Sequence, residues 1–127
     1  MTEGRTVVQT DKAPKAVGPY SQAVRAGSWV FLSGQLPMDP AGNMAKGGVR
    51  EQTRQALENL RAVLEGAGLQ MRDVVKTTVY MTDLSRFAEM NEVYGQLFES
   101  PFPARATVEV SALPKGAQVA IECVAFG

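Results

Sequence analysis

Residues 49–65 read VREQTRQALENLRAVLE, and their apolar side chains recur at the spacing of an amphipathic helix. The apolar positions of this pattern are Ala56, Leu57, Leu60, Val63 and Leu64. The opposite face carries charges of alternating sign, at Arg54, Glu58, Arg61 and Glu65. Gly66 and Gly68 follow directly, which predicts the end of the helix there. The stretch therefore predicts one long helix with a single side on the core.

Segments rich in β-branched and aromatic residues flank this helix and predict strands. Before it, we expect strands at 6–8, 21–25 and 29–33, a hairpin turn at 26–28, and a loop at 35–48. After it, we expect a strand at 74–81, a helix at 84–99, and strands at 104–110 and 118–126. The order β-β-β-α-β-α-β-β predicts a single α+β domain over residues 1–127, with both helices on one face of a mixed sheet.

The second helix shows an apolar side with one interruption. Its apolar residues are Phe87, Met90, Tyr94, Leu97 and Phe98. Asn91 interrupts this side, and a polar group there needs a partner. Asp83 or Ser85 is expected to cap the helix, and the prolines at 101 and 103 to end it.

The last strand is apolar on both faces, which predicts burial on both. One face carries Val119, Ile121, Cys123 and Ala125, and the other carries Ala120, Val124 and Phe126. Because two helices cover only one face of the sheet, we expect the other face to pack on another copy of the chain. Glu122 interrupts the second face and would then be a buried or cleft-lining carboxylate. Cys123 is expected to be a small core residue rather than a nucleophile.

Composition excludes several classes of chemistry. The 127 residues contain no histidine and one cysteine, so a Ser-His-Asp triad, a His-ligated zinc and an internal disulfide are all excluded. Lys plus Arg and Asp plus Glu each number 13, without the basic excess of a nucleic-acid or anionic-membrane surface. Residues 1–16 are polar, and no apolar run approaches ~18 residues. We therefore expect a cytoplasmic protein with no nucleic-acid and no membrane partner.

Five positions stand out as candidates for chemistry, although each also has an ordinary explanation. Arg105 opens a strand, where arginine is usually a surface residue, and Tyr20 follows a Gly-Pro turn, where a packed aromatic is common. The Ser33-Gly34 corner resembles any strand end, and Asn91 could simply satisfy a hydrogen bond. Glu122 could pair with Arg105 or another arginine in the core. Singly, none of these residues indicates a function.

Together, the motifs resemble those of the Rid/YjgF family, also described as the endoribonuclease L-PSP family. The matching segments, in order along the chain, are GPYSQ at 18–22, SGQLP at 33–37, residues 52–67, VVKTTVY at 74–80, FPAR at 102–105, LPKG at 113–116 and IECVA at 121–125. The resemblance covers essentially the whole sequence with near-constant spacing.

This resemblance implies a chorismate-mutase-like α+β fold and a homotrimer with three clefts between subunits. Similar proteins hydrolyse reactive enamine/imine intermediates, such as 2-iminobutanoate and 2-iminopropanoate, to the 2-keto acid and ammonia. These intermediates come from pyridoxal-phosphate-dependent dehydratases. No metal or cofactor is implied for the Rid protein itself.

The resemblance also suggests roles for individual residues. Arg105 would anchor the substrate carboxylate, because its planar fork binds carboxylates bidentately. The Ser33-Gly34 corner and the backbone of Thr107 would line the cleft, with Tyr20 and Asn91 close by. Tyr20 and the Ser33 hydroxyl could donate hydrogen bonds or relay protons, while main-chain groups hold the attacking water.

Two positions depart from the deaminase branch. Position 107 is often Cys there and is Thr107 here, and both residues are small. The branch typically reads Ile-Glu-Ile-Glu where this chain reads VAIE at 119–122, so Ala120 replaces the glutamate thought to orient water. Glu122 shares the parity of that position but lies about 6–7 Å further along the strand. Losing a general base typically lowers a rate by about 10²–10⁴-fold.

Three hypotheses therefore remain at the level of sequence. The first is a deaminase of small 2-imino acids. The second, favoured by Ala120, is a trimeric module that binds or senses a small carboxylate without turnover. The third is nucleolytic activity on RNA, which the neutral charge and the lack of a basic-aromatic stripe disfavour.

Overall fold

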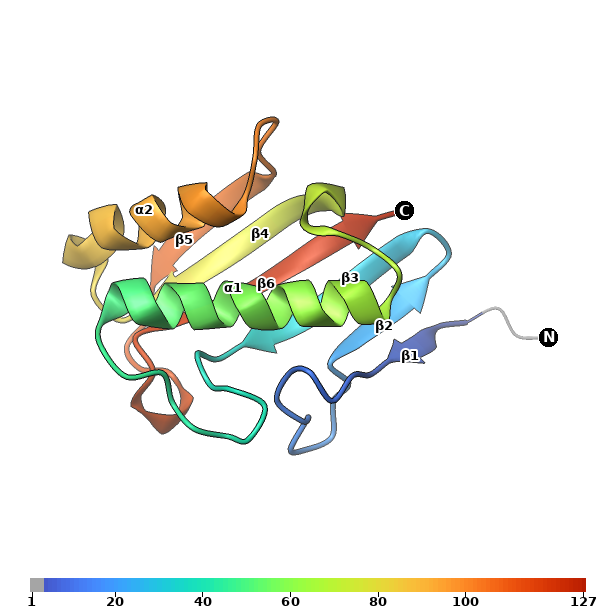
Figure 1. Ribbon diagram of the computed structural model, residues 1–127, viewed down its shortest axis with the longest axis horizontal. Helices are drawn as coiled ribbons and strands as arrows, with labels where there is room; N and C mark the ends of the chain where they lie inside the picture. The colour runs from blue at the N-terminus through green and yellow to red at the C-terminus, as the bar shows by residue number, and fades with distance from the viewer. Residues whose placement is uncertain (1–3) are drawn as a thin grey trace.

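The computed structural model describes residues 4–127, so part of the polar N-terminal stretch lies outside the described residues. Six strands form one sheet in the order β1-β2-β3-β6-β4-β5 (Figure 1). Their bounds are Thr6–Val8, Ala23–Ala26, Trp29–Gln35, Val74–Met81, Ala104–Glu109 and Val119–Phe126 for β1 to β6. Only β4 and β5 are parallel, so the predicted mixed sheet is confirmed.

Helices α1 (Val49–Gly66) and α2 (Phe87–Leu97) lie on the same face of this sheet, as predicted (Figure 1). Alternate residues of the central strands point toward them. In β6 these are Val119, Ile121, Cys123 and Ala125, all buried in the main core cluster. The buried side of α1 comprises the five predicted apolar residues together with Val49, Gln52, Thr53 and Asn59.

The ends of α1 follow from local hydrogen bonding. At the N-terminus, the Glu51 carboxylate accepts a hydrogen bond from the Gly48 amide at 2.9 Å. At the C-terminus, the amide of Gly68 donates to Glu65 at 3.0 Å and that of Leu69 donates to Leu64 at 2.8 Å. This is a Schellman motif, and its left-handed residue is Gly68, with φ of 80°. The predicted helix end is therefore confirmed.

Several predicted boundaries were wrong by one to three residues. Strand β2 begins at Ala23 because the Ser21 carbonyl accepts the Ser33 hydroxyl, at 2.5 Å, outside the strand pairing. Helix α2 begins at Phe87 because Leu84–Arg86 form a separate 3-10 turn, whose start is capped by the Asp83 carboxylate on the Ser85 amide. The helix ends before Phe98, which is extended.

The expected apolar side of α2 was also partly wrong. Val93 is buried although it was not in the predicted set, and Phe87 is exposed. Asn91 is exposed as well, so it does not interrupt the buried side. Met90 and Tyr94 are buried as predicted, and Val93 joins them in the buried stripe of the helix in place of Phe87.

The face of the sheet opposite the helices is open within one chain. Strands β5 and β6 are not neighbours, since β6 lies between β3 and β4. Trp29 and Phe126 are paired across β3 and β6 with ring centroids 4.7 Å apart, and both are nearly half exposed, as is Phe31. Within residues 4–127, no helix is long and apolar enough to cross a membrane.

Candidate functional site

Arg105 lies on β5, directly opposite Thr77 of β4, with its side chain on the helix-covered face of the sheet. Its guanidinium carbon is 4.7 Å from the centre of the Tyr94 ring and 5.5 Å from that of the Phe87 ring. Both distances are within the range of cation–π attraction. Among residues 4–127 no carboxylate is paired with Arg105 and no hydrogen bond engages its guanidinium. The aromatic rings therefore hold the Arg105 guanidinium in place, and its N–H groups remain free to donate hydrogen bonds to an anion.

Tyr94 is itself fixed by the strand next to Arg105. Its hydroxyl is 2.7 Å from the Thr77 hydroxyl, and both residues are buried. Burial raises the pKa of Tyr94, although its hydrogen bond to Thr77 and the charge of Arg105 act in the opposite direction. The phenol is therefore neutral at physiological pH, and its ring is a rigid platform for the guanidinium.

A cavity of about 420 Å³ opens beside this platform. We call it the Arg105 cavity; its lining residues are Asn91, Tyr94, Gly95, Phe102, Pro103 and Arg105. The structure thus brings together two of the predicted site residues, Arg105 and Asn91. The FPAR segment delivers two apolar residues and the arginine to this same wall.

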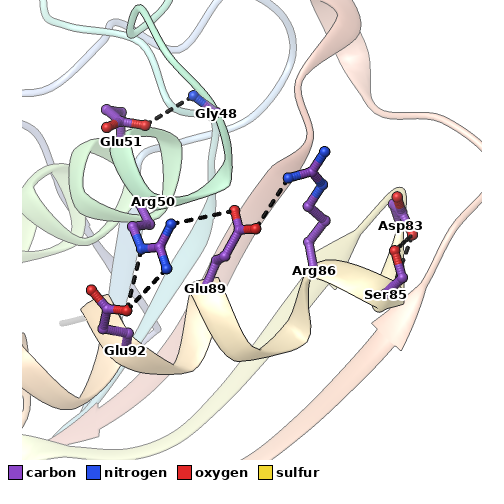
Figure 2. A network of polar contacts seen from close by, with 8 residues as sticks. All are labelled: Gly48, Arg50, Glu51, Asp83, Ser85, Arg86, Glu89 and Glu92. Atoms are coloured by element: carbon purple, nitrogen blue, oxygen red, sulfur yellow. Dashed lines mark hydrogen bonds and ion pairs between the residues drawn. The ribbon is translucent and has the colours of Figure 1, made fainter.

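Ion pairs between the helices hold α2 beside the cavity. Figure 2 shows Arg50 of α1 between Glu92, at 3.1 Å, and Glu89, at 3.9 Å. Arg86 contacts Glu89 from the other side at 3.0 Å. The hydrogen bond and charge of Glu92 raise the pKa of Arg50. Each exposed pair contributes little by itself, but together they link the first turn of α1 to the helix that carries Asn91 and Tyr94.

Tyr20 and Gly34 line a second cavity, of about 270 Å³, which we call the Tyr20 cavity. Tyr20 is about half exposed, and its hydroxyl accepts a hydrogen bond from the Val17 amide at 3.4 Å. Lys15 and Lys115 also line this cavity. No residue lines both cavities, so one chain places Tyr20 and Gly34 apart from Arg105 and Asn91.

A buried glutamine holds the loop that leads to Tyr20. The Gln22 side chain accepts from the Thr10 amide and donates to the Pro14 carbonyl, both at 2.8 Å. Gln22 is almost fully buried, and its backbone carbonyl accepts from the Ser33 amide at 2.9 Å. This connects the residues before Tyr20 to the Ser33-Gly34 corner.

The Ser33-Gly34 corner coincides with an irregularity in the pairing of β3 with β6, whose register shifts between Leu32 and Gln35. The Ser33 hydroxyl donates to the Ser21 carbonyl, so this proton is already engaged and the oxygen remains available as an acceptor. Gly34 is exposed, and a Cβ there would meet no atom within 4 Å. The strand end is therefore open where the sequence suggested a site.

Thr107 lies on β5 two residues after Arg105, so it faces the same side of the sheet. Its hydroxyl oxygen is buried and has no hydrogen-bond partner among the described residues. Thr107 lines neither the Arg105 cavity nor the Tyr20 cavity. A buried hydroxyl without a partner is unfavourable, and this one lies two residues from the arginine on the same face of β5.

Glu122 does not pair with Arg105, which corrects one of the sequence-based alternatives. It alternates with the core-facing residues of β6 and so lies on the open face of the sheet, opposite the side chain of Arg105. Its neighbours on that face include Tyr80, whose pKa is raised by burial and then by the Glu122 charge. Ala120 pairs with Tyr80 on the same face.

Cys123 is confirmed as a small core residue. It is buried between the strands and α1, and burial raises the pKa of its thiol to about 12. It is therefore protonated and inert at neutral pH. Residues 4–127 contain no group of three or more cysteine, aspartate or glutamate side chains that could hold a metal ion.

Sequence reasoning missed three residues of the arginine site. Tyr94 and Phe87 belong to the predicted apolar side of the second helix, and Thr77 lies within a predicted strand. The available signal was the spacing of two aromatic residues seven apart, which places Phe87 and Tyr94 on one side of a helix. That spacing alone does not show that the side faces Arg105.

The fold and this site define an α+β protein with a mixed six-stranded sheet, in which an arginine on an edge strand packs against two aromatic rings of a helix. The family profile described as Endoribonuclease L-PSP matches residues 10–126. The chain therefore belongs to this family, the Rid/YjgF family that its motifs resemble.

Individual relatives agree with this membership. The 2-iminobutanoate/2-iminopropanoate deaminase of Homo sapiens is 50% identical over 123 residues, covering 96% of this chain and 90% of that protein. A RutC family protein of Pyrococcus horikoshii is likewise 50% identical over 123 residues, covering 96% of this chain and 98% of the relative. The crystal structure of Escherichia coli TdcF with bound serine is similar with a TM-score of 0.91 at 43% identity, covering 96% and 98% of the two chains.

Proposed function

We propose that this protein hydrolyses small 2-imino acids, such as 2-iminobutanoate, to the 2-keto acid and ammonia. The observation that carries the proposal is the Arg105 guanidinium, which is stacked on Tyr94 and has no anionic partner among residues 4–127. A charge-assisted, bidentate contact with the substrate carboxylate satisfies this fork. The relatives named as 2-iminobutanoate/2-iminopropanoate deaminases support the same reaction class.

In this reaction, water adds to C2 of the imine and gives a carbinolamine. The nitrogen takes up a proton, the C2 hydroxyl loses its proton as the C2–N bond breaks, and ammonia leaves behind the carbonyl of the 2-keto acid. Arg105 and Asn91 orient the substrate, while Tyr20 and Ser33 supply hydrogen-bonding oxygens. The backbone of Thr107 lines the cleft of the assembly, as the family resemblance implies. Water is the only co-reactant, and the family resemblance implies no metal or cofactor.

The proposal includes a cytoplasmic homotrimer, as the family resemblance implies. The apolar open face of the sheet, with Trp29, Phe31 and Phe126 exposed, supports packing against other copies. In this assembly the Tyr20 cavity of one copy and the Arg105 cavity of the next form one cleft. Glu122, on the open face, is the candidate for orienting water.

The rival function is a trimeric module that binds a small carboxylate without turnover. Ala120 is the observation that favours it, because this position cannot supply a carboxylate to activate water. Both functions use the same arginine and differ only in chemistry.

A coupled assay separates them. A threonine dehydratase supplies the imine, semicarbazide competes for it, and the formation of 2-ketobutyrate is followed with wild type, Arg105→Ala and, as a matched control, Arg72→Ala. We expect acceleration by wild type and Arg72→Ala, and a loss of about 10–1000-fold in Arg105→Ala. No acceleration by a folded wild type that still binds 2-ketobutyrate through Arg105 would instead establish the binding module.

A further inference from the structure

Gly95 lies in the last turn of α2, at a position where glycine is unfavourable. It precedes the C-cap residue Phe98 by three positions, so it is not the glycine that commonly terminates a helix. Glycine is a poor helix former because it loses the most backbone entropy on folding. A glycine inside a helix therefore needs a reason.

The described chain itself gives no such reason. The φ angle of Gly95 is not positive, unlike that of Gly68, so a side chain is compatible with its backbone. A Cβ at Gly95 would meet no atom within 4 Å, whereas a Cβ at Gly47 would lie 2.6 Å from a Glu51 carboxylate oxygen. Neither strain nor close packing within residues 4–127 requires a glycine at position 95.

Because glycine has no side chain, the space next to position 95 in the Arg105 cavity is available to a ligand. Gly95 lines the Arg105 cavity one helical turn after Asn91, with Phe102 and Pro103 on the facing wall. Phe102 is more than half exposed. A 2-imino acid whose carboxylate binds Arg105 has its side chain on C2, close to the carboxylate, and this apolar space lies beside the anchor.

We infer that Gly95 is a specificity-determining residue, which admits 2-imino acids with apolar side chains larger than ethyl, branched or aromatic, between α2 and the Phe102-Pro103 wall. This inference rests on the proposed function, since it takes Arg105 as the carboxylate anchor. According to this inference, the residue at position 95 sets the largest substrate that can bind, although the backbone there does not require glycine.

The test compares substrates of increasing size in wild type, Gly95→Leu and the control Ala88→Leu. Ala88 is an exposed residue of the same helix that does not line the cavity. An L-amino acid oxidase generates the imines of alanine, 2-aminobutyrate, leucine and phenylalanine in situ. We expect kcat/KM of Gly95→Leu to fall at least about tenfold for the leucine and phenylalanine imines and less than about twofold for the alanine imine. Ala88→Leu should match wild type throughout.

Thermal stability and oligomeric size are measured on the same samples. Because leucine is a better helix former than glycine, Tm of Gly95→Leu should not fall. A uniform loss across all substrates, or dissociation of the oligomer, would show that Gly95 serves subunit packing and would overturn the inference. Unchanged selectivity would overturn it as well.

Binding of 2-keto acids by calorimetry distinguishes this inference from the proposed function. If no imine is hydrolysed but Gly95→Leu selectively loses the larger 2-keto acids, the size limit holds and the deaminase proposal fails. If hydrolysis depends on Arg105 but not on the residue at 95, the deaminase holds and the size limit fails. If no imine is hydrolysed and no 2-keto acid binds, both are wrong.

Discussion

The guanidinium of Arg105 is stacked on the ring of Tyr94, with 4.7 Å between the guanidinium carbon and the ring centre. The tyrosine hydroxyl contacts Thr77, and Thr77 is the strand neighbour of Arg105. Arg105 and Thr77 are thus neighbours on adjacent strands, and Tyr94 of α2 contacts both of them. A long, flexible cation is thereby held in one orientation, which reduces the entropy lost when an anion binds.

Replacing the platform should weaken binding of a small carboxylate. In Tyr94→Leu the cation–π contact with residue 94 is lost, and we expect Kd for 2-ketobutyrate to rise about 2–30-fold, from a contribution of about 0.5–2 kcal/mol. Tyr94→Phe keeps the ring and should change Kd less than about threefold. The Nε–H NMR signal of Arg105 should shift in Tyr94→Leu and stay near its position in Tyr94→Phe. An unmoved signal in both variants would contradict the platform.

The buried hydroxyl pair should be coupled in stability. Thr77→Val leaves the Tyr94 hydroxyl buried without a partner, which should lower the free energy of unfolding by about 1–3 kcal/mol. Thr77→Val combined with Tyr94→Phe removes both hydroxyls and should cost less than the sum of the single changes. Urea denaturation at fixed protein concentration measures all four proteins. Strict additivity would show that the two hydroxyls do not interact.

Gln22 should control the order of the segment before Tyr20. Gln22→Leu removes hydrogen bonds to Thr10 and Pro14 and leaves a part-buried amide and carbonyl without their partner. We expect loss of about 1–3 kcal/mol of stability and faster amide hydrogen exchange at Thr10, whose amide is bonded to the Gln22 side chain. Gln55→Leu, at a half-buried glutamine of α1, is the control. Unchanged exchange at Thr10 would contradict this role.

Cys123 should make the fold sensitive to alkaline pH. Its thiol pKa rises from 9.0 to about 12 on folding, so below pH 9 the thiol is protonated in both the folded and unfolded chain. Between pH 9 and 12 the unfolded chain releases the proton and the folded chain retains it. Stability therefore falls across this window, by up to about 1.4 kcal/mol per pH unit from this group.

The Cys123→Ala variant isolates that contribution. Its free energy of unfolding should decline less steeply than that of wild type between pH 9 and 12, in parallel urea titrations. At pH 8 the native thiol should also resist alkylation by iodoacetamide and react only after unfolding. Equal slopes in the two proteins, or rapid alkylation of the native state, would show that the thiol is accessible.

The open face of the sheet should determine the oligomeric state. Phe31→Asp places a charge among Trp29 and Phe126, and burial of an unpaired carboxylate is unfavourable. We expect the proposed trimer to dissociate in sedimentation experiments while far-ultraviolet circular dichroism stays native-like. Lys46→Asp, in the exposed loop before α1, is the control. A Phe31→Asp protein with the assembly of wild type would place the interface elsewhere.

The sequence alone determined the elements of the fold. Local patterns predicted both helices, all six strands and the glycine-terminated end of α1, because periodicity and turn residues act over short stretches of chain. Errors occurred where tertiary contacts override local patterns. The Ser21 carbonyl accepts the Ser33 hydroxyl at the expected start of β2, and the packing of α2 leaves Asn91 exposed and buries Val93.

The sequence also indicated the residue types of the site, since Arg105, Tyr20, Ser33 and Asn91 were candidates from the sequence pattern alone. Only the tertiary structure decided which of them meet. Thr77 is paired with both Arg105 and Cys123, so these side chains share one face and Glu122, next to Cys123, lies on the other. Contacts between residues far apart in sequence depend on the packing of the whole chain. This packing brings the Tyr94 ring against Arg105 and places Gly95 in the lining of the Arg105 cavity.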